Sequence, residues 1–123
     1  MKDHRSEPRV IESVPIAVTV LSSPKLPEIE HRTFPCATHD LSVRGLNFAL
    51  HSALPIGAVI HVEVALTAPA DTFRHRGRVV WTHHTQKDIV LSYRSGIRIT
   101  ETLDHRTADW AEAVERRLRA DTD

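Results

Sequence analysis

The sequence has few of the features that identify secreted, metal-binding or membrane-spanning proteins. A single cysteine, Cys36, among 123 residues excludes an internal disulfide and a cysteine-rich zinc site. No apolar run approaches the roughly 20 residues that a membrane helix needs, and the charged N-terminus lacks the apolar core of a signal peptide. We therefore expect a soluble cytoplasmic protein that does not insert into a membrane.

Aromatic residues are scarce and net charge is absent. At 5% aromatic residues, the core must depend on Val, Ile, Leu and Ala. Acidic and basic residues balance at 16 each, which argues against capture of DNA or RNA by a broad basic face. Only three cations are lysines and the rest are arginines. Arginine binds planar acceptors such as phosphate and guanine with a two-pronged fork, although high genomic GC content explains the same bias equally well.

The sequence also lacks the usual arrangements of catalytic and metal-binding residues. Nine histidines are present, including the pair His83 and His84, but no His-x₃-His spacing places two on one helix face, and Cys36 has no companion. No glycine-rich phosphate loop and no Ser-His-Asp order appears. We expect no metal, no cofactor and no enzymatic activity.

Alternating apolar residues predict a mostly β fold. In residues 60–66, for example, Ile60, Val62, Val64 and Leu66 share one face, as in a half-buried strand. Residues 22–32 contain two prolines among polar residues and indicate a loop, and 83–91 is compatible with either a loop or a hairpin. The predicted strands are 10–21, 34–40, 46–50, 60–66, 73–81 and 92–100.

The end of the chain changes to a helical period. Apolar residues from Leu103 to Leu118 form a stripe, with acidic residues early and arginines late, as the helix dipole favours. We expect a helix at about 103–120 that closes one end of a six-stranded antiparallel β-barrel. Residues 10–123 would form this single domain, preceded by a mobile arm, residues 1–9. Trp81 and Trp110 lie on apolar faces and are predicted to be core residues.

A polar corner lies between the second and third predicted strands. It reads Asp40-x-Ser42-x-x-Gly45. Asp and Ser side chains can bond the backbone two residues on, and Gly45 can adopt a positive φ, so a tight turn by itself explains the residues.

The arm adds a second motif, Arg5-x-x-x-Arg9. Taken alone, two arginines near a terminus indicate a solvated charged segment. Upstream of the Asp40 corner, however, the pair resembles the signature of the PilZ domain, the bacterial receptor module for cyclic di-GMP. The resemblance extends to Gly-Arg-Val-Val-Trp at 77–81, Ser-Gly-Ile-Arg-Ile at 95–99 and the final helix, and so covers nearly the whole chain. Each motif is weak alone, but the ordered pair is fairly specific.

The resemblance implies a PilZ-like split β-barrel and a ligand site for cyclic di-GMP. The implied ligand-binding residues are Arg5, Arg9, Asp40, Ser42 and Gly45. Further arginines could border the ligand, namely Arg44, Arg94 and Arg98, although a solvated surface explains each of them as well. An arginine fork matches guanine O6 and N7, and a carboxylate accepts the guanine N–H groups. We expect the loose arm to close over the ligand.

The resemblance also implies a receptor that acts on motility, exopolysaccharide or biofilm through an unidentified downstream protein. A monomer or weak homo-oligomer is expected, with the ligand stoichiometry open. One alternative is a PilZ-like interaction scaffold that binds no nucleotide, which the intact arginine pair argues against. Another is a barrel that binds DNA or RNA through an arginine stripe at 74, 76 and 78. The zero net charge and the few aromatics count against it.

Overall fold

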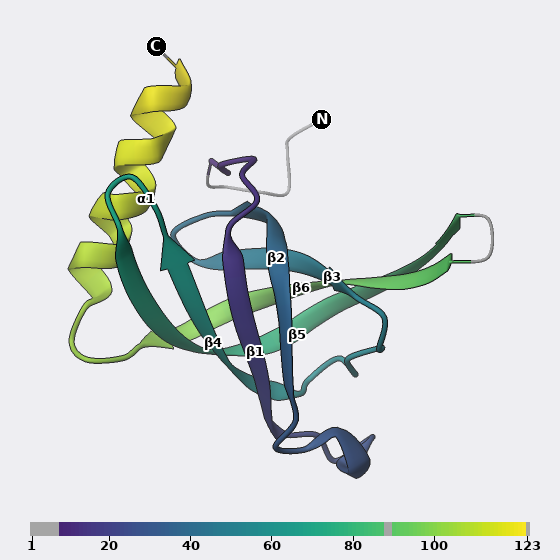
Figure 1. Cartoon of the computed structure of the whole chain (residues 1–123). Helices are drawn as coiled ribbons and strands as arrows, with labels where there is room; N and C mark the ends of the chain where they lie inside the picture. The colour runs from purple at the N-terminus through teal and green to yellow at the C-terminus, as the bar shows by residue number, and fades with distance from the viewer. Residues whose placement is uncertain (1–7, 88–89, 123) are drawn as a thin grey trace, which may run out of the picture.

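A computed structural model describes residues 8–87 and 90–122, and Figure 1 shows a barrel of six strands with one helix at its end. The barrel is closed in the order β1-β2-β3-β6-β5-β4, and all neighbouring strands are antiparallel. The predicted mostly β fold, the antiparallel barrel and the C-terminal helix are thus confirmed. The elements are β1 (Pro15–Ser22), a 3-10 turn η1 (Pro27–Ile29), β2 (Thr33–Leu41), β3 (Gly45–Leu50), β4 (Val59–Leu66), β5 (Asp71–Lys87), β6 (Val90–Thr102) and α1 (Thr107–Thr122).

The barrel interior is aliphatic, as the scarcity of aromatic residues required. Val18 of β1 lies opposite Val62 of β4, and both side chains are fully buried. Each buried side chain of this size contributes about 1.5–3 kcal/mol relative to an exposed one. Exposed and partly exposed residues such as His61 and Glu63 alternate with them. The alternation of the sequence therefore sets which face of each strand points inward.

The first strand is shorter than its sequence pattern predicted. β1 begins at Pro15. Residues 10–14, which precede it, contact β2 outside the regular strand pairing. Val10 forms an isolated antiparallel bridge with Leu41, and the Thr38 hydroxyl accepts from the Val14 N–H and donates to the Glu12 carbonyl. The predicted arm, residues 1–9, falls mostly outside the described residues, so its mobility stays a prediction.

The helix docks through Trp110, which is 1% exposed. Its ring meets Phe73 and His75 edge-on, with centroids 5.2 and 4.4 Å apart. Its indole Nε1–H donates to the Val43 carbonyl at 2.9 Å. The prediction that Trp110 belongs to the core is confirmed. The helix begins at Thr107, later than the predicted residue 103.

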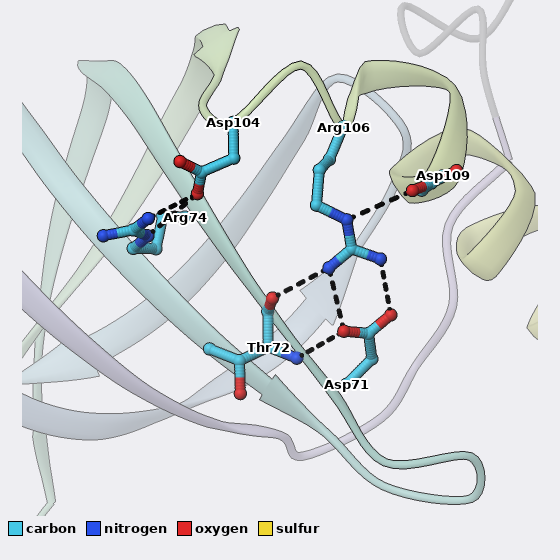
Figure 2. A network of polar contacts seen from close by, with 6 residues as sticks. All are labelled: Asp71, Thr72, Arg74, Asp104, Arg106 and Asp109. Atoms are coloured by element: carbon cyan, nitrogen blue, oxygen red, sulfur yellow. Dashed lines mark hydrogen bonds and ion pairs between the residues drawn. The ribbon is translucent and has the colours of Figure 1, made fainter.

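A network of charged residues secures the start of the helix to β5, as Figure 2 shows. The Arg106 guanidinium forks onto both carboxylate oxygens of Asp71, at 2.7 and 2.8 Å, and also donates to Asp109. It lies over the Phe73 ring, 4.3 Å from the centroid. The Arg106 hydrogen bond lowers the pKa of Asp71. Asp71 therefore stays ionised to a lower pH than a free aspartate does.

The sequence left residues 83–91 open between a loop and a hairpin, and those of them that the structure describes, 83–87 and 90–91, belong to the two strands of a long hairpin. β5 continues to Lys87 and β6 begins at Val90, and this two-stranded ribbon projects beyond the barrel (Figure 1). The pairing register shifts between Val79 and Trp81, so Val80 is an extra residue in β5. This bulge turns Trp81 outward and leaves it 38% exposed. The prediction that Trp81 is a core residue is therefore wrong.

The single cysteine is half-buried on β2. Burial raises the pKa of the Cys36 thiol to about 11, so the thiol is protonated at neutral pH and a poor nucleophile. Cys36 packs against the hydrophobic core as a partly buried residue.

His75 is the one histidine among the fully buried residues of the barrel. Its Nδ1 lies 3.0 Å from the Thr102 hydroxyl, and its Nε2 has no partner among the described residues. Burial, with a smaller repulsion from His61, lowers the pKa of His75 from 6.5 to about 4. The ring is therefore neutral at pH 7.

We predict that mild acid destabilises the barrel through His75. Because the folded-state pKa of about 4 lies below the unfolded value of 6.5, only the unfolded chain gains a proton between these values, and stability falls as the pH drops. At 1.36 kcal/mol per unit, the free energy of unfolding should fall by about 2 kcal/mol from pH 6.5 to 5. Urea denaturation at pH 7 and 5 measures the loss. A His75→Phe variant should show little of it, and an equal loss in that variant would contradict this cause.

Candidate functional site

The bridge between Val10 and Leu41 fixes the chain that leads into the site. The two residues exchange backbone hydrogen bonds of 2.8 and 3.0 Å, and both side chains are buried. The preceding residue, Arg9, is thereby held beside the end of β2. The position of Arg9 is therefore set by the neighbouring backbone pairing as well as by the contacts of its own side chain.

Arg9 clasps the polar corner with two hydrogen bonds. Its Nε donates to Asp40 Oδ1 at 2.7 Å, and its Nη1 donates to the Ser42 hydroxyl at 3.2 Å. Asp40 is 5% exposed, and a carboxylate so buried needs such a charged partner. Arg9 of the first predicted motif thus contacts Asp40 and Ser42 of the second.

Ser42 closes the corner. Its hydroxyl donates to the Gly45 carbonyl and accepts from the Gly45 N–H, each at 3.2 Å, and its own N–H also bonds to that carbonyl at 2.8 Å. Together with the bond from Arg9, these contacts occupy the hydroxyl. Ser42 therefore orients the corner and the guanidinium of Arg9.

Gly45 is required for a reason other than the one predicted. Its φ is not in the left-handed region, so the expected positive φ is wrong. A Cβ atom at this position would lie 2.5 Å from the Ile97 carbonyl oxygen. Gly45 lets β3 and β6 approach closely directly beneath the corner.

Asp40 continues into a row of outward-facing residues across the barrel. Asp40 pairs with Asn47 on β3, and Asn47 pairs with Gly96 on β6. Arg94 of β6 donates from Nε to Asn47 Oδ1 at 3.0 Å, and its Nη2 lies 3.9 Å from Asp40 Oδ2. The carboxylate therefore lies between two arginines, Arg9 and Arg94.

Trp81 ends this row. It pairs with Gly96, and its indole ring occupies the space that a Gly96 side chain would fill, with ring atoms 2.1–2.7 Å from that Cβ position. With strands about 4.8 Å apart, the ring lies on the same face as Asp40, about two strand spacings away. The Trp81 ring is therefore close enough to the Asp40 carboxylate for one ligand to contact both.

Arginines gather around this face although the chain has no net charge. Arg98 is paired with Gly45 and with Arg78, and Arg44 belongs to the corner itself. All three side chains are exposed. Because Arg9 pairs with Asp40, the other arginines give this face a net positive charge. That charge favours an anionic ligand.

The structure brings together four of the five predicted site residues, Arg9, Asp40, Ser42 and Gly45. Arg5 lies outside the described residues. Of the three arginines predicted to border the ligand, Arg98 is next to Gly45 in the sheet, Arg44 lies within the corner, and Arg94 donates to Asn47. Their roles in ligand binding stay predictions.

Two further residues of this face were not assigned to it from sequence. Asn47 lies between Leu46 and Phe48, and the outward phase of this strand could have indicated it. Trp81 was placed in the core because the bulge at Val80 is invisible to simple alternation. Arg94 was considered at the periphery, but its contact with Asn47 depends on the register of β3 and β6.

Comparison with known proteins identifies the family. The sequence profile described as PilZ domain matches residues 3–116. The chain belongs to the PilZ domain family. PilZ domains are receptors for cyclic di-GMP and are typically non-catalytic.

Solved PilZ structures share the fold of this chain. The Bacillus subtilis inhibitor of motility, MotI/DgrA, is similar with a TM-score of 0.72 and 10% sequence identity over 97% of this chain, which spans only 53% of that protein. The PilZ domain of CeSA from a cellulose-synthesizing bacterium gives a TM-score of 0.55 and 14% identity, over 86% of this chain and 93% of that one. No curated protein sequence gives a significant match.

Within 8–87 and 90–122, no group of three or more His, Cys, Asp or Glu side chains is arranged to hold a metal ion. No helix in this part of the chain has the length and apolar character to cross a membrane.

We predict that Gly45→Ala destabilises the protein. The added methyl group would collide with the Ile97 carbonyl, and backbone shifts of this kind cost about 1–3 kcal/mol. Thermal denaturation followed by circular dichroism should show a lower midpoint than wild type. An Ala49→Ser variant, on the exposed outward side of the same strand, should stay close to wild type. Unchanged stability in Gly45→Ala would show that the two strands can separate freely.

Proposed function

We propose that this PilZ domain is a receptor for cyclic di-GMP, bound on the outer barrel face around Asp40. The observation that carries the proposal is the pair of bonds from Arg9 to Asp40 and Ser42, which unites the two family motifs. The guanine bases and phosphates of the ligand match the donors and acceptors on this face.

Guanine recognition would fall to Arg9 and Asp40. Within the described residues Arg9 donates from Nε and Nη1, which leaves further N–H groups of its five for guanine O6 and N7. Asp40 Oδ1 accepts from Arg9, while Oδ2 has Arg94 at 3.9 Å and has capacity for guanine N–H donors. Ser42, whose hydroxyl is occupied, would act by holding this geometry.

The two phosphates would meet the surrounding arginines. Arg44, Arg94 and Arg98 lie on or beside the face, and charge-assisted hydrogen bonds to phosphate are about twice as strong as neutral ones. The local excess of positive charge would also speed the encounter with an anionic ligand.

Arg5 would supply the second fork of the clasp. The backbone at Arg9 is already set by the bridge between Val10 and Leu41. A charge-assisted contact of Arg5 would offset part of the conformational entropy lost when the arm is ordered. We propose that binding fixes residues 1–9 against the barrel and changes the surface offered to a downstream protein.

The output would be regulatory. One similar structure is an inhibitor of motility and another comes from a cellulose-synthesizing bacterium, and we propose control of motility, exopolysaccharide or biofilm for this chain. The alternative arginine stripe on β5 is already engaged in part, because Arg74 pairs with Asp104 and Arg76 with Glu101. This favours the solvated interpretation of the stripe over binding of DNA or RNA.

We predict that arginine removal weakens binding of cyclic di-GMP. Arg9→Ala and Arg5→Ala should each reduce affinity by roughly tenfold to a hundredfold, the loss of one charge-assisted contact. Isothermal titration calorimetry with cyclic di-GMP, beside GTP and cyclic di-AMP, measures this loss and the stoichiometry.

Two control variants distinguish loss of the two-pronged arginine contact from loss of charge and from loss of folding. Arg9→Lys keeps the charge but loses the fork, so it should remain weak. Arg116→Ala on α1, which removes an exposed arginine paired only with Glu112, should bind as wild type does. No heat with the wild-type protein would favour the scaffold alternative, and full affinity in Arg9→Ala would exclude the clasp.

We predict that Trp81 stacks on a base of the ligand. Base stacking on an aromatic side chain contributes about 1–3 kcal/mol, so Trp81→Ala should bind roughly 5- to 100-fold more weakly, and Trp81→Phe should lose less. The chain has two tryptophans and Trp110 is buried, so a fluorescence change on titration should vanish in Trp81→Phe. A full fluorescence response in that variant would place the ligand elsewhere.

A further inference from the structure

The hairpin beyond the barrel is an incomplete sheet. β4 last pairs with β5 at Arg78, and Val79 exchanges backbone bonds with Gly57 and Ala58. From Thr82 to Lys87, the pairings of β5 are with β6 alone. Two-stranded ribbons are marginally stable in water, and a third strand is what usually stabilises them.

The two edges of this ribbon differ. On the β6 side, the His51 ring lies 3.3 Å from the Leu91 carbonyl, and pairing with β3 reaches Tyr93. On the β5 side, residues 82–85 have no backbone partner other than β6 among the described residues. Alternate residues of an antiparallel strand direct their N–H and C=O groups away from the partner. The open edge is therefore that of β5.

This edge lacks the usual protection against pairing. Natural edge strands carry charged residues, proline or bulges that block further strands. Residues 80–86 read Val-Trp-Thr-His-His-Thr-Gln, with no Asp, Glu, Lys, Arg or Pro, and the one bulge lies at the base of the ribbon. Asp71 and the arginines of β5 lie where the strand is already paired with β4, and Lys87 lies at the far end of the strand.

Exposed apolar side chains surround the same edge. Five large apolar residues are exposed in the described chain, and four lie here. Val80, Trp81 and Leu91 belong to the hairpin. Ile56 precedes Gly57, whose N–H donates to the Val79 carbonyl, so it lies where the support of β4 ends.

We propose that this edge pairs with the same edge of a second copy of the chain, forming a symmetric antiparallel dimer. The edge is complementary to itself, because antiparallel pairing about a two-fold axis matches outward N–H groups with outward carbonyls. Residues 80–86 bring no like-charged Lys, Arg, Asp or Glu together. The second hairpin continues the sheet where β4 stops and covers apolar residues near Ile56 and Val80.

Such an interface is small. One strand edge with a few side chains buries less than the roughly 1,200–2,000 Å² of a stable interface, so we expect a weak dimer with a dissociation constant of order 100 µM. The edge begins beside Trp81, which belongs to the proposed nucleotide face, whereas Asp40 lies on β2 and Arg9 precedes β1, so association is measured without ligand.

Sedimentation velocity of the ligand-free wild-type chain, at about 10 µM to 1 mM, tests the proposal. The expected result is a concentration-dependent rise from the mass of one chain, 13.9 kDa, toward twice that mass. Thr82→Lys/His84→Lys places two positive charges on each edge and should weaken association by at least about tenfold. The matched control, Ala37→Lys/Ala65→Lys, adds the same charge on exposed positions of β2 and β4 and should associate as wild type does.

A proline scan at 82, 83, 84 and 85 locates the contact. At positions whose N–H points away from β6, proline removes only that outward donor. At the positions in between, it removes a hydrogen bond to β6 and breaks the hairpin. Two alternate variants should therefore keep wild-type thermal stability and lose the dimer. The proposal is overturned if wild type stays at 13.9 kDa throughout. It is also overturned if it forms oligomers that the double lysine variant forms equally, or if every stable proline variant still dimerises.

Discussion

The hydrogen bond from the Trp110 indole to the Val43 carbonyl is the contact on which the rest of the arrangement depends. It reaches the inner side of the corner that carries Asp40 and Ser42 on its outer side. The indole is fixed in turn by Phe73 and His75, and the helix start by Arg106. The last element of the chain therefore supports the geometry of a corner formed near its beginning. Weaker packing of Trp110 would therefore loosen the corner and with it the position of the Asp40 carboxylate.

The distribution of charged residues over this protein is more informative than its net charge. Sixteen cations balance sixteen anions, yet the anions that pair with β5 lie at the helix end of the barrel, as Asp104 and Glu101 do. On the face around Asp40, arginines from β5, β6, the corner and the arm outnumber the one carboxylate. The separation gives an anionic ligand a preferred side of a molecule whose total charge attracts nothing.

Much of the fold could be predicted from the sequence because alternation is a local property of the backbone. Val18 or Ile60 faces inward whatever strand lies beside it, and the helical stripe identifies Trp110 as buried. The pairing of strands distant in sequence is not local, so the neighbourhood of Asp40, Asn47 and Arg94 could not be derived from spacing. Gly45 shows the same limit: its position in the motif was evident, but the approach of the Ile97 carbonyl belongs to the tertiary structure.

The extra residue at Val80 acts as a phase shift in β5. Side chains before it point inward at odd numbers, from Phe73 to Val79, whereas Trp81, also odd, points outward. Deletion of Val80 would remove the bulge and let the tryptophan follow Val79 directly, so the tryptophan would stay opposite Gly96 on the outward face. If β5 kept its length but ran without the bulge, Val80 would pair with Gly96 instead, and the tryptophan and the side chains after it would turn to the opposite face of the ribbon. The face that a residue of this hairpin presents is therefore set by whether a bulge precedes it, and counting alternate residues from a core position misassigns it.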